Sequence, residues 1–236
     1  ISTVSNIIRQ QISTPLLDCF KRKIVYFYKP LFLDEFFSHP KLSQFINQGP
    51  VTPDHVIRIK SKPLVLDFSM TKVSDIEKKL IKSITEFKIN YQKYFFKNKK
   101  YNKSAKILDS YPRLIVIKGL GIFSTGASLK DAKIAMDVGI NSLSVILNAS
   151  KYGTFRSIPP NEIFRMEYWP LELAKLKSTT TRLTGSVTVI TGGLGSIGYA
   201  AAKKFKKEGS EIVIIDILDP NKISQDLDGI TYFKCD

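Results

Sequence analysis

A glycine-rich turn between a β-branched run and a helical segment constrains this chain more than any other feature. The run Val187–Ile190 predicts a strand and leads directly into Thr191–Gly198, which spells TGGLGSIG. The segment 199–208 has the Ala and Lys content of a helix, and Glu211–Asp216 predicts a second strand that ends on a carboxylate. This order of strand, glycine turn, helix, strand and acid is typical of a parallel βαβ unit.

The turn also indicates a ligand. It brings backbone N–H groups and the positive end of a helix dipole against a pyrophosphate, an approach that side chains would block. Asp216 can accept hydrogen bonds from both hydroxyls of a ribose and would repel a 2′-phosphate, so NAD is expected in preference to NADP. The residues predicted to approach the pyrophosphate are Gly192, Gly195, Ser196, Ile197 and Gly198.

This segment resembles the start of the short-chain dehydrogenase/reductase family, whose opening motif is T-G-x-x-x-G-x-G. Ser196 stands where that motif has its middle glycine. The spacing found here, T-G-x-x-G-x-x-G, is nearer to the extended members, so a sugar-nucleotide epimerase or dehydratase stays an alternative. The expected strand Ile230–Lys234 is followed by Cys235 and Asp236, and the resemblance implies that Asp236 contacts the adenine.

The same resemblance implies that the catalytic groups, a Ser and a Tyr-x-x-x-Lys, lie beyond residue 236. Tyr199 and Lys203 spell the second motif, but they fall in the helix directly after the phosphate turn, so we interpret this match as coincidental. No catalytic residue is therefore predicted here, and the chain alone is expected to have no dehydrogenase turnover. Because it opens with Ile1 and stops just after a strand, we expect a piece of a longer polypeptide.

The positive charge is unevenly distributed. The formal net charge is +15, and residues 1–181 hold 29 basic against 14 acidic residues, whereas residues 182–236 hold 7 of each. The densest stretch, 71–106, has the apolar spacing of one amphipathic helix, with a capping box predicted at Ser74 and Glu77. The lysines of this helix then lie on its solvent-exposed face, so nucleic-acid binding is not expected. A basic binding module with a merely structural nucleotide fold is the non-enzymatic alternative.

Strands and helices alternate upstream of the turn, which indicates an α/β region. Residues 63–67 and 112–117 predict strands, 119–126 predicts a strand-turn-strand connection, and Ser128 with Asp131 predicts the cap of an amphipathic helix. Ser178–Thr181 has the composition of a linker. We therefore expect two domains, residues 1–177 and 178–236.

Three sequence segments of the first region show a second resemblance. They are Gly49–Arg58 with Lys62–Val65, Gly119–Phe123 with Gly126, and Glu167–Trp169 with Leu171–Leu176. Placed before a dehydrogenase fold, they resemble the bifunctional rhamnulose-phosphate aldolase/short-chain dehydrogenase family of rhamnose catabolism. The resemblance implies a class II aldolase/adducin-like α/β region followed by the first half of a Rossmann-type doubly wound parallel sheet. It also implies aldol cleavage of a sugar phosphate and oxidation of a lactaldehyde-like product with NAD, with a primarily lyase function as the alternative.

No metal site is predicted in this chain. Class II aldolases hold a divalent metal with three His, and the sequence has neither an H-x-H pair nor a His at the later turn, where Leu120 stands. The resemblance therefore implies ligands upstream of Ile1. His39 is interpreted as structural, and so is His55, although Arg58 near it could grip a phosphate.

The remaining expectations concern localisation, disulfide bonds and partners. No apolar run approaches the roughly 18 residues of a membrane span, and Cys19 and Cys235 stand too far apart in sequence to suggest a disulfide framework. We expect a cytoplasmic homo-oligomer that binds NAD and a small sugar-derived substrate, without membrane or nucleic-acid partners.

Overall fold

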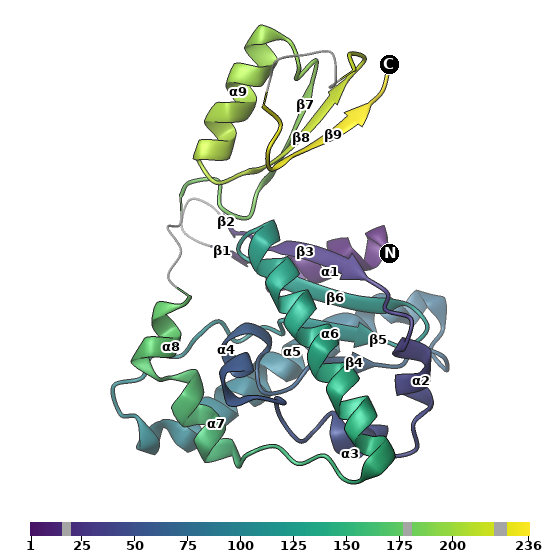
Figure 1. Ribbon diagram of the computed structural model, residues 1–236, viewed down its shortest axis with the longest axis vertical. Helices are drawn as coiled ribbons and strands as arrows, with labels where there is room; N and C mark the ends of the chain where they lie inside the picture. Colours follow the sequence, from purple (N-terminus) through teal and green to yellow (C-terminus); the bar gives the residue numbers. More distant parts are fainter. Residues whose placement is uncertain (16–19, 177–180, 220–225) are drawn as a thin grey trace.

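The computed structural model describes residues 1–15, 20–176, 181–219 and 226–236 (Figure 1). The described residues form a four-stranded mixed sheet, a three-stranded parallel sheet and a short two-stranded antiparallel ladder. The expected α/β class is confirmed. The predicted boundary between residues 177 and 178 falls at positions outside the described residues, so the division into two domains stays a prediction.

The elements of the first region are short except for two long helices. In chain order they are α1 (Ser2–Ile12), β1 (Thr14–Pro15), β2 (Phe20–Lys21), β3 (Ile24–Tyr28), α2 (Leu33–Ser38), α3 (Leu42–Phe45), α4 (Val56–Ile59), β4 (Leu64–Leu66), α5 (Val73–Asn98), β5 (Leu114–Ile117), β6 (Gly121–Gly126), α6 (Leu129–Tyr152), α7 (Pro160–Glu167) and α8 (Pro170–Ala174). Single turns of 3-10 helix occur at Pro53–His55 and Lys99–Tyr101.

The mixed sheet has the strand order β3-β6-β5-β4. Strands β3, β6 and β5 pair antiparallel, and β4 joins β5 in parallel. Every residue of β5 and β6 is buried. Strands with both faces buried consist of continuous apolar residues rather than an alternating pattern, and the run Leu114–Ile117 fits this rule.

Helices cover both faces of the sheet (Figure 1). Leu114 and Val116 pack on one face with residues of α6, whereas Ile115 and Ile117 pack on the other face with α1 and α5. This division follows from the two-residue period of a strand. Gly139 lets α6 lie close to the sheet, because a Cβ at this position would stand 2.4 Å from Leu114 Cδ1.

Most of the expected elements are confirmed, with one correction. Ser128 caps α6, and its Oγ accepts from the Asp131 amide at 3.1 Å. The capping box predicted at Ser74 and Glu77 is wrong, because α5 already begins at Val73 with Lys72 as its N-cap. A capping residue needs a non-helical backbone. Lys72 has one, with φ −61° and ψ 142°, whereas Ser74 is already helical.

The second region is one βαβ unit with a third strand. It contains β7 (Val187–Thr191), α9 (Ser196–Lys207), β8 (Glu211–Asp216) and β9 (Ile230–Lys234). The three strands are parallel in the order β7-β8-β9. Ala202 of α9 packs with Leu194, Ile212 and Ile214 in a small core on one face. The predicted strand, turn, helix and strand are all confirmed.

The two regions contact each other directly. The Leu129 amide, at the start of α6, donates to Glu211 Oε1 of β8 at 2.7 Å. Arg9 donates to the Gly185 carbonyl oxygen at 2.8 Å. No helix in the parts of the chain described here has the length and apolar character needed to cross a membrane.

A buried ionic network joins the end of α4 to α5 and α7. Lys60 Nζ lies 3.5 Å from Glu167 Oε1 and 3.8 Å from the centre of the Tyr91 ring. The Tyr91 hydroxyl lies 2.8 Å from both Glu167 Oε1 and Tyr168 Oη. Burial raises the pKa of Glu167, although the Lys60 charge opposes this, and burial lowers the pKa of Lys60 to about 8.

Removing one charge of the Lys60–Glu167 pair is expected to lower the free energy of unfolding far more than removing both charges. Lys60→Met leaves the Glu167 carboxylate buried without its cation, a change that costs about 3–5 kcal/mol. The double variant Lys60→Met/Glu167→Gln should recover most of this loss, measured by urea unfolding. Lys82→Met, at an exposed ion pair with Glu86, is the control and should change stability by less than about 1 kcal/mol. A double variant as unstable as Lys60→Met would contradict the expectation.

The same pair predicts how stability depends on pH. Between pH 8 and 10.5 the unfolded chain keeps the Lys60 proton while the folded protein loses it, so the free energy of unfolding rises with pH in this window. Between pH 7.5 and 9.5 the wild type should gain on the order of 2 kcal/mol relative to the double variant, which titrates at neither position. Equal pH profiles for the two proteins would show that Lys60 has an ordinary pKa.

Candidate functional site

The glycine turn between β7 and α9 has a backbone that favours glycine. Gly192 has φ +63°, in the left-handed region. Its amide donates to the Ile215 carbonyl oxygen at 2.9 Å, and its own carbonyl oxygen accepts from the Gly195 amide at 3.2 Å. The turn is therefore closed by its own backbone and tied to the neighbouring strand β8.

Three glycines of the turn differ in what a side chain would contact. A Cβ at Gly193 would lie 2.7 Å from Ile214 Cγ2, and one at Gly198 would lie 2.5 Å from the Gly192 carbonyl oxygen. Packing inside the protein therefore explains the absence of a side chain at both positions. A Cβ at Gly195 would meet nothing closer than the Gly192 oxygen at 3.4 Å, an ordinary contact. The space beside Gly195 is free to receive a ligand.

Helix α9 directs its N-terminus towards this space. Gly195 is its N-cap, and the Tyr199 amide donates to the Gly195 carbonyl oxygen at 2.8 Å. The first amides of a helix have no partner inside the helix, and the helix dipole adds positive charge there. Ser196 and Ile197 are exposed, with 88% of Ile197 accessible. The open space beside Gly195, at a helix N-terminus, suits the pyrophosphate of a dinucleotide.

Asp216 anchors the turn from the end of β8. Its Oδ2 accepts from the Leu194 amide at 2.8 Å, and its Oδ1 accepts from the Leu218 amide at 3.0 Å. These bonds, to Leu218 and to Leu194, lower the pKa of Asp216, so the carboxylate is ionised at neutral pH. Each oxygen of a carboxylate has a second lone pair, and Asp216 as a whole is buried at the end of β8.

The structure brings most of the predicted residues together. Gly192, Gly195, Ser196, Ile197 and Gly198 form one continuous turn and helix start, and Asp216 reaches it through the Leu194 amide. Asp236 is exposed and follows β9. The Cys235 amide donates to the Asp216 carbonyl oxygen at 3.0 Å, which holds the ends of β8 and β9 side by side. The roles of all seven residues in binding NAD stay predictions.

The contact between Leu194 and Asp216 could not be inferred from the sequence, because a backbone amide is present at every non-proline position and carries no residue signal. Tyr199 and Lys203 lie in α9, as the sequence predicts. The Tyr199 hydroxyl donates to the Asp226 carbonyl oxygen at 2.7 Å, and Lys203 Nζ lies 5.6 Å from the centre of the Tyr199 ring. This hydroxyl is engaged by the protein itself.

Each of the two histidines lies beside a serine of α6. His55 Nδ1 lies 3.2 Å from Ser142 Oγ, and His39 Nε2 lies 3.0 Å from Ser150 Oγ. Leu120, at the turn where the resemblance implies a His, is partly buried against the core. Within the described ranges no three His, Cys, Asp or Glu residues gather into a group that could hold a metal ion. Cys19 lies outside those ranges.

A family model and several curated proteins match this chain. The model of the family described as "Aldolase class II, second domain" matches residues 1–176. The chain is similar to "Uncharacterized oxidoreductase YuxG" of Bacillus subtilis (strain 168), with 37% identity over 183 residues, which cover 75% of this chain and 26% of that protein. No solved structure gives a significant match.

Shorter similarities involve short-chain dehydrogenases. "Short chain aldehyde dehydrogenase 1" of Euphorbia lathyris is 40% identical over 63 residues, which cover 25% of this chain and 22% of that protein. "Borneol dehydrogenase, mitochondrial" of Lavandula x intermedia is 44% identical over 57 residues, which cover 23% of this chain and 22% of that protein. The chain spans about a quarter of the length of these curated relatives.

The open space beside Gly195 allows dinucleotide binding to be tested with a substitution that should not affect folding. Gly195→Ala should leave thermal unfolding unchanged, because the new methyl group meets no short contact, but it should obstruct the pyrophosphate and weaken NAD binding at least about tenfold in calorimetric titration. Gly153→Ala is the matched control, since a Cβ there meets nothing within 4 Å far from the turn. Equal NAD affinities for the two variants would exclude this turn as the site.

Proposed function

The chain belongs to the family of class II aldolase second domains, and from this we propose that it is part of a bifunctional enzyme that joins such a domain to the NAD-binding half of a short-chain dehydrogenase. One observation carries the dehydrogenase part: the turn Gly192–Gly198 leaves a space without side chains at a helix N-terminus and is fixed by the carboxylate of Asp216.

In this proposal each predicted residue has a distinct task. The backbone at Gly192, Gly195 and Gly198 and the first amides of α9, at Ser196 and Ile197, hold the pyrophosphate. Asp216 accepts from the adenosine ribose, and its negative charge disfavours the 2′-phosphate of NADP. Asp236 contacts the adenine. NAD supplies a hydride acceptor or donor when bound.

We propose that the substrate is a small hydroxyaldehyde or alcohol of lactaldehyde type. The groups that exchange a proton with it, a Ser and a Tyr-x-x-x-Lys, are assigned to residues outside this chain, and so is any divalent metal for aldol cleavage. We further propose a cytoplasmic homo-oligomer that acts on small sugar-derived molecules rather than on nucleic acid or membranes.

A second candidate is an enzyme whose main activity is aldol cleavage, with the nucleotide-binding part secondary. The family match over residues 1–176 favours it, because it covers far more of the chain than the similarity to short-chain dehydrogenases. The glycine spacing of the turn likewise keeps a sugar-nucleotide-modifying enzyme in consideration.

The decisive experiment uses the full-length gene product. With NAD and lactaldehyde it should form NADH, followed by absorbance, whereas NADP should support a rate at least about tenfold lower. Gly195→Ala should lower the rate of NADH formation at least about tenfold at limiting NAD, and Gly153→Ala should preserve it. Cleavage of a ketose phosphate, measured in the same preparations, should survive Gly195→Ala.

Three results would contradict the proposal. Cleavage without any NAD binding by the wild type would favour the lyase, and full NADH formation by Gly195→Ala would remove the turn from the mechanism. Turnover of a sugar nucleotide in place of lactaldehyde would favour the alternative substrate class.

A further inference from the structure

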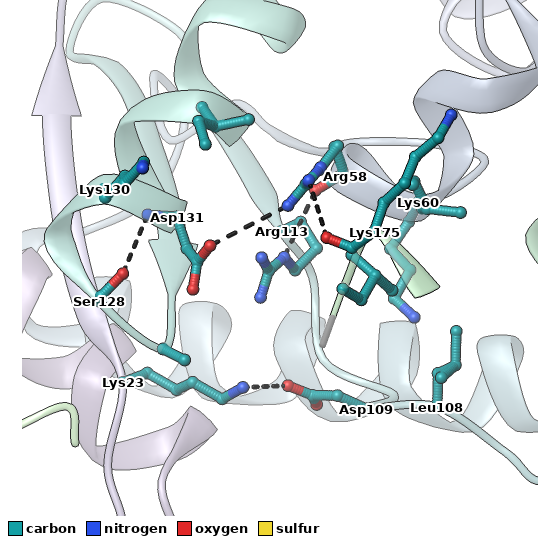
Figure 2. Close-up of a pocket in the computed structure, with 14 residues that line it drawn as sticks. Lys23, Arg58, Lys60, Leu108, Asp109, Arg113, Ser128, Lys130, Asp131 and Lys175 are labelled. Atoms are coloured by element: carbon teal, nitrogen blue, oxygen red, sulfur yellow. Dashed lines mark hydrogen bonds and ion pairs between the residues drawn. The ribbon is translucent and has the colours of Figure 1, made fainter. Parts of the chain in front are cut away.

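A pocket rich in basic side chains opens in the first region, away from the glycine turn (Figure 2). Its volume is about 540 Å³, within the usual range of small-molecule sites. Two acidic residues, Asp109 and Asp131, line it together with six basic ones: Lys23, Arg58, Lys60, Arg113, Lys130 and Lys175. It shares no lining residue with the turn Gly192–Gly198 or with Asp216.

The sheet register explains why these residues meet. Ile24 of β3 pairs with Gly126 of β6, and Leu114 of β5 pairs with Ser124 of β6. The starts of β3 and β5 therefore lie at the same edge of the sheet as the end of β6. Lys23 directly precedes β3, Arg113 directly precedes β5, and Lys130 follows β6 in the first turn of α6.

Four of the six cations have acidic partners within the described residues. Lys23 pairs with Asp109 at 2.6 Å, Arg58 with Asp131 at 4.0 Å, Lys60 with Glu167 at 3.5 Å and Lys175 with Glu172 at 2.6 Å. Burial alone would raise the pKa of Asp109, but the Lys23 charge and hydrogen bond hold it below its ordinary value. Pairing thus leaves an excess of two positive charges, those of Arg113 and Lys130.

Arg113 lies at the centre of the pocket (Figure 2). Its Nε donates to the Arg58 carbonyl oxygen at 3.4 Å. Burial and the neighbouring Arg58 charge both lower the pKa of Arg113, although Asp109 and Asp131 oppose this. A desolvated guanidinium beside a second one favours an anion, and the planar fork of Arg matches the oxygens of a phosphate.

The first turn of α6 borders the same space. Ser128 and Lys130 line the pocket, and the long helix places the positive end of its dipole there. This end already attracts a carboxylate, because the Leu129 amide donates to Glu211. The Leu129 amide is therefore already engaged, as is the Asp131 amide, which donates to Ser128 Oγ, and the positive charge of the pocket comes from its basic side chains.

We propose that this pocket binds a small phosphate monoester, with Arg113 and Lys130 contacting the phosphate group. The excess of two positive charges matches the charge of a phosphate monoester dianion, and a monocarboxylate would leave one of them uncompensated. The size of the pocket suits a short phosphorylated metabolite and is too small for a folded polyanion. The proposal does not rest on NAD binding or on hydride transfer.

The test measures anion binding to the 236-residue chain by calorimetry at pH 7.5 and constant ionic strength. Inorganic phosphate and glycerol 3-phosphate should each bind at one site, and lactate should bind at least about tenfold more weakly. Arg113→Gln should weaken phosphate binding at least about tenfold, and Lys130→Gln, at an exposed side chain, about threefold. Arg165→Gln, at an exposed ion pair outside the pocket, is the control and should bind like the wild type.

Several outcomes would overturn the proposal. They are the absence of phosphate binding, equal loss in Arg165→Gln, and displacement of phosphate by NAD, which would assign the anion to the glycine turn. Lactate binding as tight as phosphate would contradict the ligand class, and binding of an oligonucleotide through Arg113 without phosphate binding would make the pocket a polyanion surface. If Arg113→Gln does not fold, Lys130→Gln decides, since an unchanged phosphate affinity there contradicts the site.

Discussion

Burial of strands β5 and β6 on both faces is the constraint on which the first region depends. Apolar side chains on both sides of a sheet require two helical layers, and α6 on one face with α1 and α5 on the other supply them. Because the middle of the sheet excludes charge, β5 and β6 contain no charged residue, and Arg113 and Lys118 stand at the edges of the sheet where β5 begins and ends. The basic pocket lies at one such edge, so its position is a consequence of the core.

Local signals in the sequence were sufficient for much of this fold. The apolar run before Ile117, the Ser128 cap and the alternation around the glycine turn each act within a few residues, and the structure confirms all three. The capping box at Ser74 failed because the helix begins earlier: its N-cap is Lys72, two residues before Ser74, and Lys72 makes no side-chain cap that a motif could signal. A capping motif gives the kind of element more reliably than its first residue.

The basic pocket could not be predicted in the same way. Lys23, Arg113 and Lys175 are far apart in the chain. None of them belongs to a sequence motif that distinguishes it from the many basic residues of the surface. The antiparallel register of β3, β6 and β5 brings Lys23 and Arg113 to one place, and Lys175 reaches it from the end of α8. The proposed dinucleotide site is the opposite case, since its glycines and Asp216 fall within one βαβ unit and the spacing itself predicts the geometry.

Strand β8 has a different contact at each end. Glu211, its first residue, holds the N-terminal amide of α6, and Asp216, its last residue, holds the Leu194 amide of the turn. Six extended residues span roughly 20 Å and cannot shorten without breaking their ladder on both sides. The strand thus works as a strut between the helix and the turn. A rigid-body displacement of the parallel sheet must either carry α6 with it or leave the Leu129 amide without its carboxylate.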